Sequence, residues 1–277
     1  LPLHAPPFDK IKDTDYQPAL EEGMKQQLAE IEAIANSKAK PTFENTIVAM
    51  EKSGRMLDRV TSAFFGVVQA NTNDTLDKVQ SDEAPKLAEQ GDAIFLNDKL
   101  FKRVKAVYDA RDSLKLDPES MQLLKVYYFQ FIHAGANLSD ADKAKLRELN
   151  KQDATLQTDF QQKLIAASKA AAFITDNKAD LAGLSDAEIA AAAKAAEDRK
   201  MPGKYVIPQQ NTTQQPVLAE LTSRDVREKI FNNSWTRAEK GDANDTRSDI
   251  QQLAQLRAQK AKLLGYPNWA AYVLYDQ

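Results

Sequence analysis

Apolar residues recur every three or four positions along most of this chain, the spacing that places side chains on one face of an α-helix. The first of these stripes predicts a helix from about residue 15 to about residue 36. Its apolar members are Tyr16, Leu20, Met24, Leu28, Ile31 and Ala35. A second stripe runs from Phe43 to Val68 and includes Gly54, where we expect another backbone to approach closely because glycine has no side chain.

Boundary signals divide the middle of the chain into further helices. Helices are predicted over residues 74–95 and over a shorter segment near residues 100–108. Asp117 as the cap, Pro118 at the first helical position and Gly135 at the end define the helix that follows.

The longest predicted helix begins at the capping box formed by Ser139 and Asp142 and continues to about residue 170. Its apolar stripe consists of Leu146, Leu149, Leu156, Phe160 and Leu164. A stripe sustained over about 30 residues indicates a long antiparallel hairpin or a bundle arm.

Two short segments, residues 171–176 and 204–209, have the composition of β-strands, with an alanine-rich helix that begins at Ser185 between them. A two-stranded ribbon is marginal by itself, so we expect it to rest on helices. The last third is predicted to be helical, with one helix ending at Gly265 and a short one beginning at Asn268.

The predicted fold class is therefore all-α or nearly so, with long antiparallel helices and at most a small two-stranded ribbon. We expect residues 1–277 to form one helical domain, with residues 1–138 as a helical bundle and residues 139–277 as a long hairpin with the ribbon and linking helices. No internal repeat of fixed period is present, which disfavours a helical solenoid.

Composition narrows the possible partners. Lys and Arg total 37 and Asp and Glu total 40, so the net charge is −3 and we expect no nucleic-acid partner, which would require a basic stripe. The chain has no cysteine, which excludes disulfides, thiolate zinc sites and a cysteine nucleophile. No run approaches the roughly 18 apolar residues of a membrane helix, so we expect no membrane partner. The compartment stays open: the cytoplasm, or the periplasm if Leu1 follows a removed signal peptide.

Few residues of the chain are candidates for a catalytic or metal-binding role. The two histidines, His4 and His133, cannot form an H-E-x-x-H zinc helix, which needs two histidines four residues apart on one helical face. We interpret His4 as a solvent-exposed residue and His133 as a core or cap residue whose charged form is favoured by a helix C-terminus. Neither a G-x-S-x-G elbow nor a phosphate-binding glycine loop occurs.

Two other groups of residues have ordinary structural interpretations. The pairs Glu21 with Lys25 and Glu22 with Gln26 are spaced as surface partners on a helix, which is favoured over a paired-carboxylate active site. The aromatic residues between 127 and 131 are favoured as core rather than as a peptide-binding platform.

Five N-x-S/T triplets match the acceptor pattern of N-glycosylation, which would matter only in a protein secreted by a eukaryote. They begin at Asn73, Asn137, Asn211, Asn232 and Asn244.

Several longer stretches carry a family resemblance. "LPLHAPPFDKIKDTDYQPALEEGM", "KPTFENTIVAMEKSG" and "ANTNDTLDKV" resemble successive landmarks of the thimet oligopeptidase family of zinc metallopeptidases. "DARDSLKLDPES", "AGANLSDADKAKLRELN", "IPQQNTTQQPVLAEL" and "WTRAEKGDANDTRSDI" are most similar to its bacterial dipeptidyl carboxypeptidase branch. The final "LRAQKAKLLGYPNWAAYVL" is similar to the segment that links the N-terminal helical part of that family to the rest.

The resemblance implies that the catalytic residues lie in a part of the protein other than this chain. In that family two mostly helical halves flank a deep, narrow channel with zinc at its floor. The H-E-x-x-H helix, a later Glu ligand and the Tyr, His and Arg groups that hold the substrate have no match in this chain, so no catalytic, cofactor-binding or metal-binding residue is carried over.

The intact relative would use Zn²⁺ to release dipeptides from the C-termini of short unstructured peptides. This chain would form one channel wall, bind no zinc, be inactive alone and have the missing C-terminal catalytic half as its partner. The alternative is a stand-alone helical interaction or scaffold protein without catalysis, and the gene sequence beyond Gln277 would separate the two hypotheses.

Overall fold

The computed structural model describes residues 5–276, apart from the side chains of residues 211 and 212. The chain divides into two compact units, Leu1–Thr158 with Leu253–Gln277, and Asp159–Gln252. We call the first the helical unit and the second the ribbon unit. The expected sub-parts, residues 1–138 and 139–277, stay a prediction, because a division by compactness is no test of which parts fold independently.

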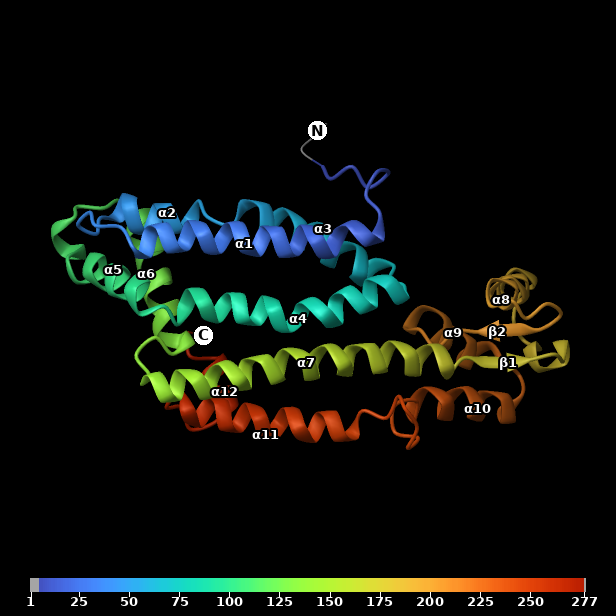
Figure 1. Cartoon of the computed structure of the whole chain (residues 1–277). Helices are drawn as coiled ribbons and strands as arrows, with labels where there is room; N and C mark the ends of the chain where they lie inside the picture. Colours follow the sequence, from blue (N-terminus) through green and yellow to red (C-terminus); the bar gives the residue numbers. More distant parts are fainter. Residues whose placement is uncertain (1–4, 277) are drawn as a thin grey trace. The chain divides into compact units, whose positions relative to one another are not determined.

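Long helices make up the helical unit (Figure 1). Its helices are α1 (Tyr16–Ala35), α2 (Ala49–Glu51), α3 (Arg55–Ala70), α4 (Asp74–Phe95), α5 (Asp98–Asp109), α6 (Pro118–Ala134), the first part of α7 (Asp140–Ala170), the last part of α11 (Arg247–Leu263), and α12 (Trp269–Val273). Short helical turns occur at Asp13–Asp15, Phe43–Val48 and Arg111–Ser113. The prediction of a mainly helical fold is confirmed.

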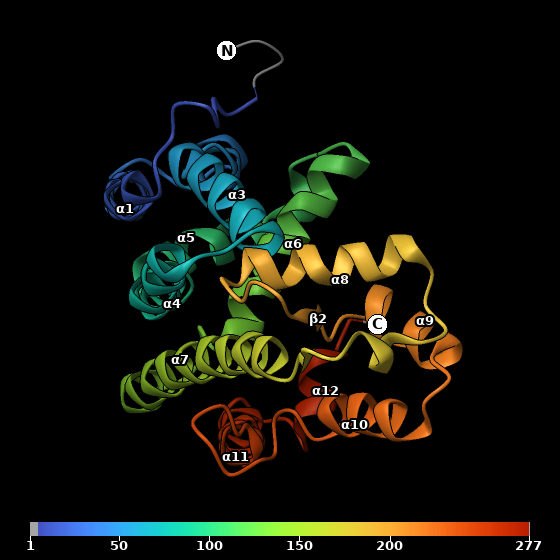
Figure 2. The ribbon, with the colours of Figure 1, turned by 90° about the vertical axis from the view of Figure 1, so that its right-hand side faces the viewer.

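The ribbon unit contains the two predicted strands. They are β1 (Phe173–Thr175) and β2 (Tyr205–Ile207), which pair antiparallel with Ile174 opposite Val206. The other elements of this unit are a turn at Lys178–Leu181, α8 (Asp186–Asp198), α9 (Asn211–Glu220) and α10 (Arg224–Trp235). Figure 2 shows the ribbon between α8 and α10, so the ribbon rests on helices as expected. The sequence pattern did not predict α9, which lacks an apolar stripe and contains Pro216.

The predicted helix boundaries follow the caps closely. The Asp117 side chain accepts a hydrogen bond from the Ser120 backbone N–H at 3.0 Å, which begins α6. The Ser139 hydroxyl accepts one from the Asp142 N–H at 3.2 Å and begins α7. Ser185 and Glu188 form a reciprocal capping box at the start of α8. These interactions satisfy backbone donors that a helix leaves unpaired at its start.

The second apolar stripe is interrupted at Gly54, which adopts φ +75° and separates α2 from α3. The expected close approach of a backbone is wrong for this residue: a Cβ here would lie 2.3 Å from Nε2 of the Gln27 side chain. The backbone contact is at Gly23, where a Cβ would lie 3.0 Å from the Leu57 Cα. Glycine at position 23 therefore allows α1 and α3 to pack closely.

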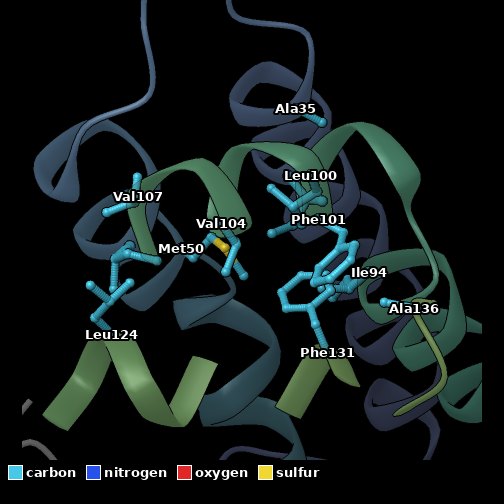
Figure 3. Packing of buried hydrophobic residues seen from close by; sticks show 12 residues of the cluster. Ala35, Met50, Ile94, Leu100, Phe101, Val104, Val107, Leu124, Phe131 and Ala136 are labelled. Atoms are coloured by element: carbon cyan, nitrogen blue, oxygen red, sulfur yellow. The ribbon is translucent and has the colours of Figure 1, made fainter. Parts of the chain in front are cut away.

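The main core of the helical unit lies between α1, α4, α5 and α6. Phe131 of α6 is fully buried, with its ring centroid 5.1 Å from that of Phe95 and 5.7 Å from that of Phe101. Figure 3 shows the Phe101 and Phe131 rings side by side in this cluster. Leu124 is also fully buried, so the interpretation of the aromatic segment of α6 as core is confirmed for the stripe that contains both residues.

Candidate functional site

His133, in the last turn of α6, is stacked between two tyrosines from the end of the chain. Its ring centroid lies 4.0 Å from that of Tyr272 and 3.9 Å from that of Tyr275, with the planes nearly parallel. Its Nδ1 lies 3.2 Å from the Tyr266 hydroxyl. The Asn268 side chain accepts a hydrogen bond from the Ala271 N–H, which begins α12 and directs this aromatic segment. We call His133, Tyr266, Tyr272 and Tyr275 the aromatic clasp.

The surroundings of His133 favour a neutral imidazole. Burial lowers the pKa of His133, Lys260 lowers it further, and Asp276 opposes them. The net direction is the opposite of the one expected from the C-terminus of α6, and desolvation is its largest cause. Burial also raises the pKa of Tyr272 to about 12, so its hydroxyl stays protonated at neutral pH.

A polar network of the same unit joins α4, α7 and α11. Asp153 accepts a hydrogen bond from Arg257 Nε at 3.3 Å, and Lys260 Nζ lies 3.8 Å from its second oxygen. Asn150 donates to Asp92 Oδ1 at 2.6 Å. Burial raises the pKa of Asp92 and lowers the pKa of Lys260. Perturbed groups of this kind occur both at functional sites and in structural ion-pair networks.

The network and the aromatic clasp meet at Trp269. The Arg257 guanidinium lies 5.4 Å from the Trp269 ring centroid and the Lys260 ammonium lies 5.6 Å from it. These cation–π contacts hold the first residue of α12 against α11, while the clasp holds the rest of α12 against α6. The arrangement fixes the C-terminal segment rather than presenting a nucleophile with its base.

Two comparisons with known proteins bear on function. The family model "Peptidase family M3" matches residues 217–277. The chain is 50% identical over 277 residues to the dipeptidyl carboxypeptidase of Escherichia coli, a match that covers 100% of this chain and 41% of that relative. The chain is thus similar to a dipeptidyl carboxypeptidase over its whole length and to family M3 peptidases over residues 217–277. The dipeptidyl carboxypeptidase of Salmonella typhimurium gives the same identity and coverage.

More distant relatives, which are oligopeptidases, match nearly all of the chain as well. The organellar oligopeptidase A of Arabidopsis thaliana is 24% identical over 275 residues, which is 96% of this chain and 34% of that protein. The chain spans about two fifths of the length of the dipeptidyl carboxypeptidases that it matches. These comparisons confirm the resemblance noted in the sequence.

The segment matched by the family M3 model carries two of the five residues of the polar network and three of the four residues of the aromatic clasp. It includes Arg257, Lys260, Tyr266 and Tyr272, whereas their partners on α4, α6 and α7 precede it. The sequence analysis considered His133 alone and missed the tyrosines that cover it. The three aromatic residues of "WAAYVLY" were the available signal, but their partner lies more than 130 positions away.

The donor set of residues 5–276 does not fit a zinc site. His133 Nδ1 faces the Tyr266 hydroxyl, both ring faces lie against tyrosines, and Asp276 is the carboxylate whose charge acts on the ring. No group of three His, Cys, Asp or Glu side chains that could hold a metal ion occurs among residues 5–276. His4, interpreted above as solvent-exposed, lies outside the described residues.

The acidic residues of α1 form surface interactions. Gln26 donates to Glu22 at 2.9 Å, as the spacing predicted, and Glu22 also pairs with Lys25 at 3.3 Å. Glu21 pairs with Lys86 of α4 rather than with Lys25.

No helix in the described part of the chain is both long and apolar enough to cross a membrane.

Proposed function

We propose that this chain is the helical, non-catalytic part of a family M3 peptidase that removes dipeptides from the C-termini of short unstructured peptides. The observation that carries the proposal is the 50% identity to a dipeptidyl carboxypeptidase, sustained over all 277 residues. In this proposal the chain forms a wall of the substrate channel and holds no catalytic residue.

The zinc ion on which such a peptidase depends would be held by residues outside this chain. Support comes from the donor set, since the one histidine in the described region is enclosed by tyrosines. The chain alone is therefore proposed to bind no stoichiometric zinc and to release no dipeptide.

Exposed apolar residues of the ribbon unit support a further protein segment as the partner of this chain. Phe231 and Trp235 stack on each other at a centroid distance of 5.8 Å, yet Trp235 is 73% exposed. Ile250 is also more than half exposed. Such side chains in solvent favour a surface that another protein part covers. We propose that the catalytic half of the peptidase does so.

A chimera tests the proposal directly. The part of the E. coli dipeptidyl carboxypeptidase that this chain matches would be replaced by residues 1–277, and release of dipeptides from an acylated tetrapeptide would be followed by chromatography. We expect the chimera to bind zinc and release dipeptides, and residues 1–277 alone to do neither. A folded, zinc-loaded chimera without activity, or zinc-dependent activity of the chain alone, would overturn the proposal.

A variant of that chimera tests the partner surface. Replacing Phe231 and Trp235 with serine should loosen the contact with the catalytic half and lower dipeptide release at least tenfold. The control replaces Phe129, which is 44% exposed on α6 of the helical unit, and should keep full activity. Equal activity of both variants would show that Phe231 and Trp235 are not part of the contact.

A further inference from the structure

A hollow of 510 Å³ in the helical unit lies between α1 and α3. Figure 1 and Figure 2 show these two helices side by side. The wall formed by α3 and the turn before it carries three basic side chains, Lys52, Arg55 and Arg59, whereas the wall formed by α1 carries one acidic side chain, Glu30. Sites for small molecules commonly have volumes of about 300–1,000 Å³, so the hollow is large enough for such a ligand.

The hollow has more positive charge than its own residues neutralise. Lys52, Arg55 and Arg59 are exposed, and none of them forms an ion pair or a side-chain hydrogen bond with any residue that the structure describes. Glu30 is already engaged, because its Oε2 accepts a hydrogen bond from the Gly54 backbone N–H at 2.7 Å. The lining therefore has a surplus of two positive charges, which an anionic ligand would complement.

Two acidic residues close in sequence to the lining do not supply that anion. Asp58 lies in the first turn of α3 but does not line the hollow, and its charge acts on Tyr127 of α6. Glu22 of α1 accepts a hydrogen bond from Gln26 at 2.9 Å and pairs with Lys25 at 3.3 Å. Neither carboxylate pairs with a basic residue of the hollow.

The basic residues also occupy an unfavourable part of α3. The start of a helix favours negative charge, because the positive end of the helix dipole lies there. This 16-residue helix nevertheless has Arg55 as its first residue and Arg59 one turn later, and its cap, Gly54, forms no side-chain hydrogen bond. A local rule that is broken without a compensating contact is expected at a functional site. An anion bound here would interact favourably with both arginines and with the helix start.

We propose that this hollow binds a phosphorylated small molecule, with its phosphate held by Lys52, Arg55 and Arg59 and its organic part against Met56 and Val60. A phosphate monoester carries a charge of about −2 at neutral pH, which matches the surplus of two positive charges, and its oxygens accept hydrogen bonds from arginine and lysine. Met56 and Val60 are partly buried and line the same hollow. The site goes beyond the proposed peptidase function, since it requires neither zinc nor dipeptide release.

The first test identifies the ligand class. The 277-residue chain is titrated with phenyl phosphate at low ionic strength and neutral pH, followed by calorimetry, and we expect a dissociation constant of about 1 mM or lower. Inorganic phosphate, which lacks the organic part, and benzoate, which carries a single charge, should each bind at least tenfold more weakly. No binding of phenyl phosphate, or equal affinity for benzoate, would overturn the assignment of a phosphate. Equal affinity for inorganic phosphate would overturn the assignment of an organic part.

The second test locates the phosphate. Replacing both Arg55 and Arg59 with glutamine should weaken binding of phenyl phosphate at least tenfold, and α3 should remain folded because the change removes positive charge from its start. The matched control replaces Lys38 and Lys102 with glutamine, which changes the net charge equally. These exposed lysines of the same unit do not line the hollow and pair with no described residue. An unchanged affinity in the arginine variant, or an equal loss in both variants, would overturn the site.

The third test locates the organic part. Met56→Gln keeps a side chain of similar length but makes the wall polar. It should weaken binding of phenyl phosphate about threefold and leave binding of inorganic phosphate unchanged, because only the phenyl group contacts this wall. An unchanged affinity for phenyl phosphate, or an equal loss for both ligands, would contradict the placement of the organic part against Met56.

Discussion

The two units of the chain use aromatic and polar residues in opposite ways. In the helical unit the Phe131 ring is fully buried among other rings, and even His133 has both ring faces covered. In the ribbon unit the stacked pair Phe231 and Trp235 remains in solvent, and one edge of β1 is unpaired. The helical unit covers the rings of Phe131 and His133, whereas the ribbon unit leaves the Phe231 and Trp235 pair in solvent.

The cores of the two units explain this difference. Long helices in the helical unit bury large side chains at regular spacing, so packing alone fixes their positions. The ribbon unit relies on strands of three residues and on α8, whose buried residues are alanines. The core around Phe173, Leu221 and Ile230 has fewer buried residues than the main core of the helical unit, and it leaves the Phe231 and Trp235 rings accessible. Stability is expected to concentrate in the helical unit and the contact with the catalytic half in the ribbon unit.

The strongest test of this comparison between the two units is Phe131→Ala. The substitution should lower the free energy of unfolding by about 3–5 kcal/mol, because it leaves a cavity beside Phe95 and Phe101. The chain has two tryptophans, Trp269 in the helical unit and Trp235 in the ribbon unit. Urea unfolding followed by fluorescence in Trp235→Phe and Trp269→Phe backgrounds therefore reports on each unit separately.

The control for this substitution is Phe129→Ala on the same helix, where the side chain is largely exposed and the change should stay within about 0.5 kcal/mol. The Trp269 transition should move to lower urea for Phe131→Ala more than the Trp235 transition does. Equal shifts of both transitions would show that the units unfold together, and that stability is not concentrated in one of them.

A smaller effect is expected at the contact between α1 and the turn before α3. Gly54→Ala places a Cβ where φ is +75° and where the Gln27 side chain already lies, so it should cost about 1–3 kcal/mol. Gly66→Ala is the matched control, because nothing lies within 4 Å of a Cβ there and alanine favours a helix. Chemical unfolding should show Gly54→Ala as destabilising and Gly66→Ala as neutral or stabilising; the reverse order would contradict the packing described for Gly54.

The sequence predicted most of the fold because its signals are local. The caps at Asp117 and Ser185 and the stripe of α1 act within a few residues, and their helices begin and end close to the expected positions. It failed at Gly54, where an apolar position inside a stripe is also a left-handed turn. It also failed at α9, which has no amphipathic pattern and depends on buried contacts of Val217 and Leu221 with the rest of the ribbon unit.

The sites were harder to predict because they join distant positions. Nothing near His133 in the sequence indicates that Tyr272 and Tyr275 will cover it. A hollow of the ribbon unit is lined by Lys229 of α10 together with residues of β1, a juxtaposition that no spacing in the sequence encodes. The absence of catalytic motifs could be stated from the sequence, whereas the enclosure of the imidazole required the packed structure.

The smallest expected effect is the pH dependence of the aromatic clasp, which would sharpen the comparison by showing that the covered imidazole of the helical unit is held in its neutral form. Burial lowers the pKa of His133 below its ordinary value of about 6.5, so the unfolded chain binds the proton more tightly than the folded chain. The stability that His133 confers should be complete above that pH and be lost as the pH falls towards the folded pKa. Lys260, Asp276 and the three clasp tyrosines are the titratable groups that face the ring.

His133→Phe keeps an aromatic ring between Tyr272 and Tyr275 but removes the titration. Compared with the parent between pH 7.5 and pH 5.5, the variant should lose less of its free energy of unfolding, because other groups titrate equally in both chains. The histidine Cε1–H signal that is absent from the variant identifies His133 in the NMR spectrum of the parent, and it should titrate below pH 6.5. A midpoint above that value would mean that the C-terminus of α6 and Asp276 outweigh desolvation, and that the clasp holds a charged imidazole.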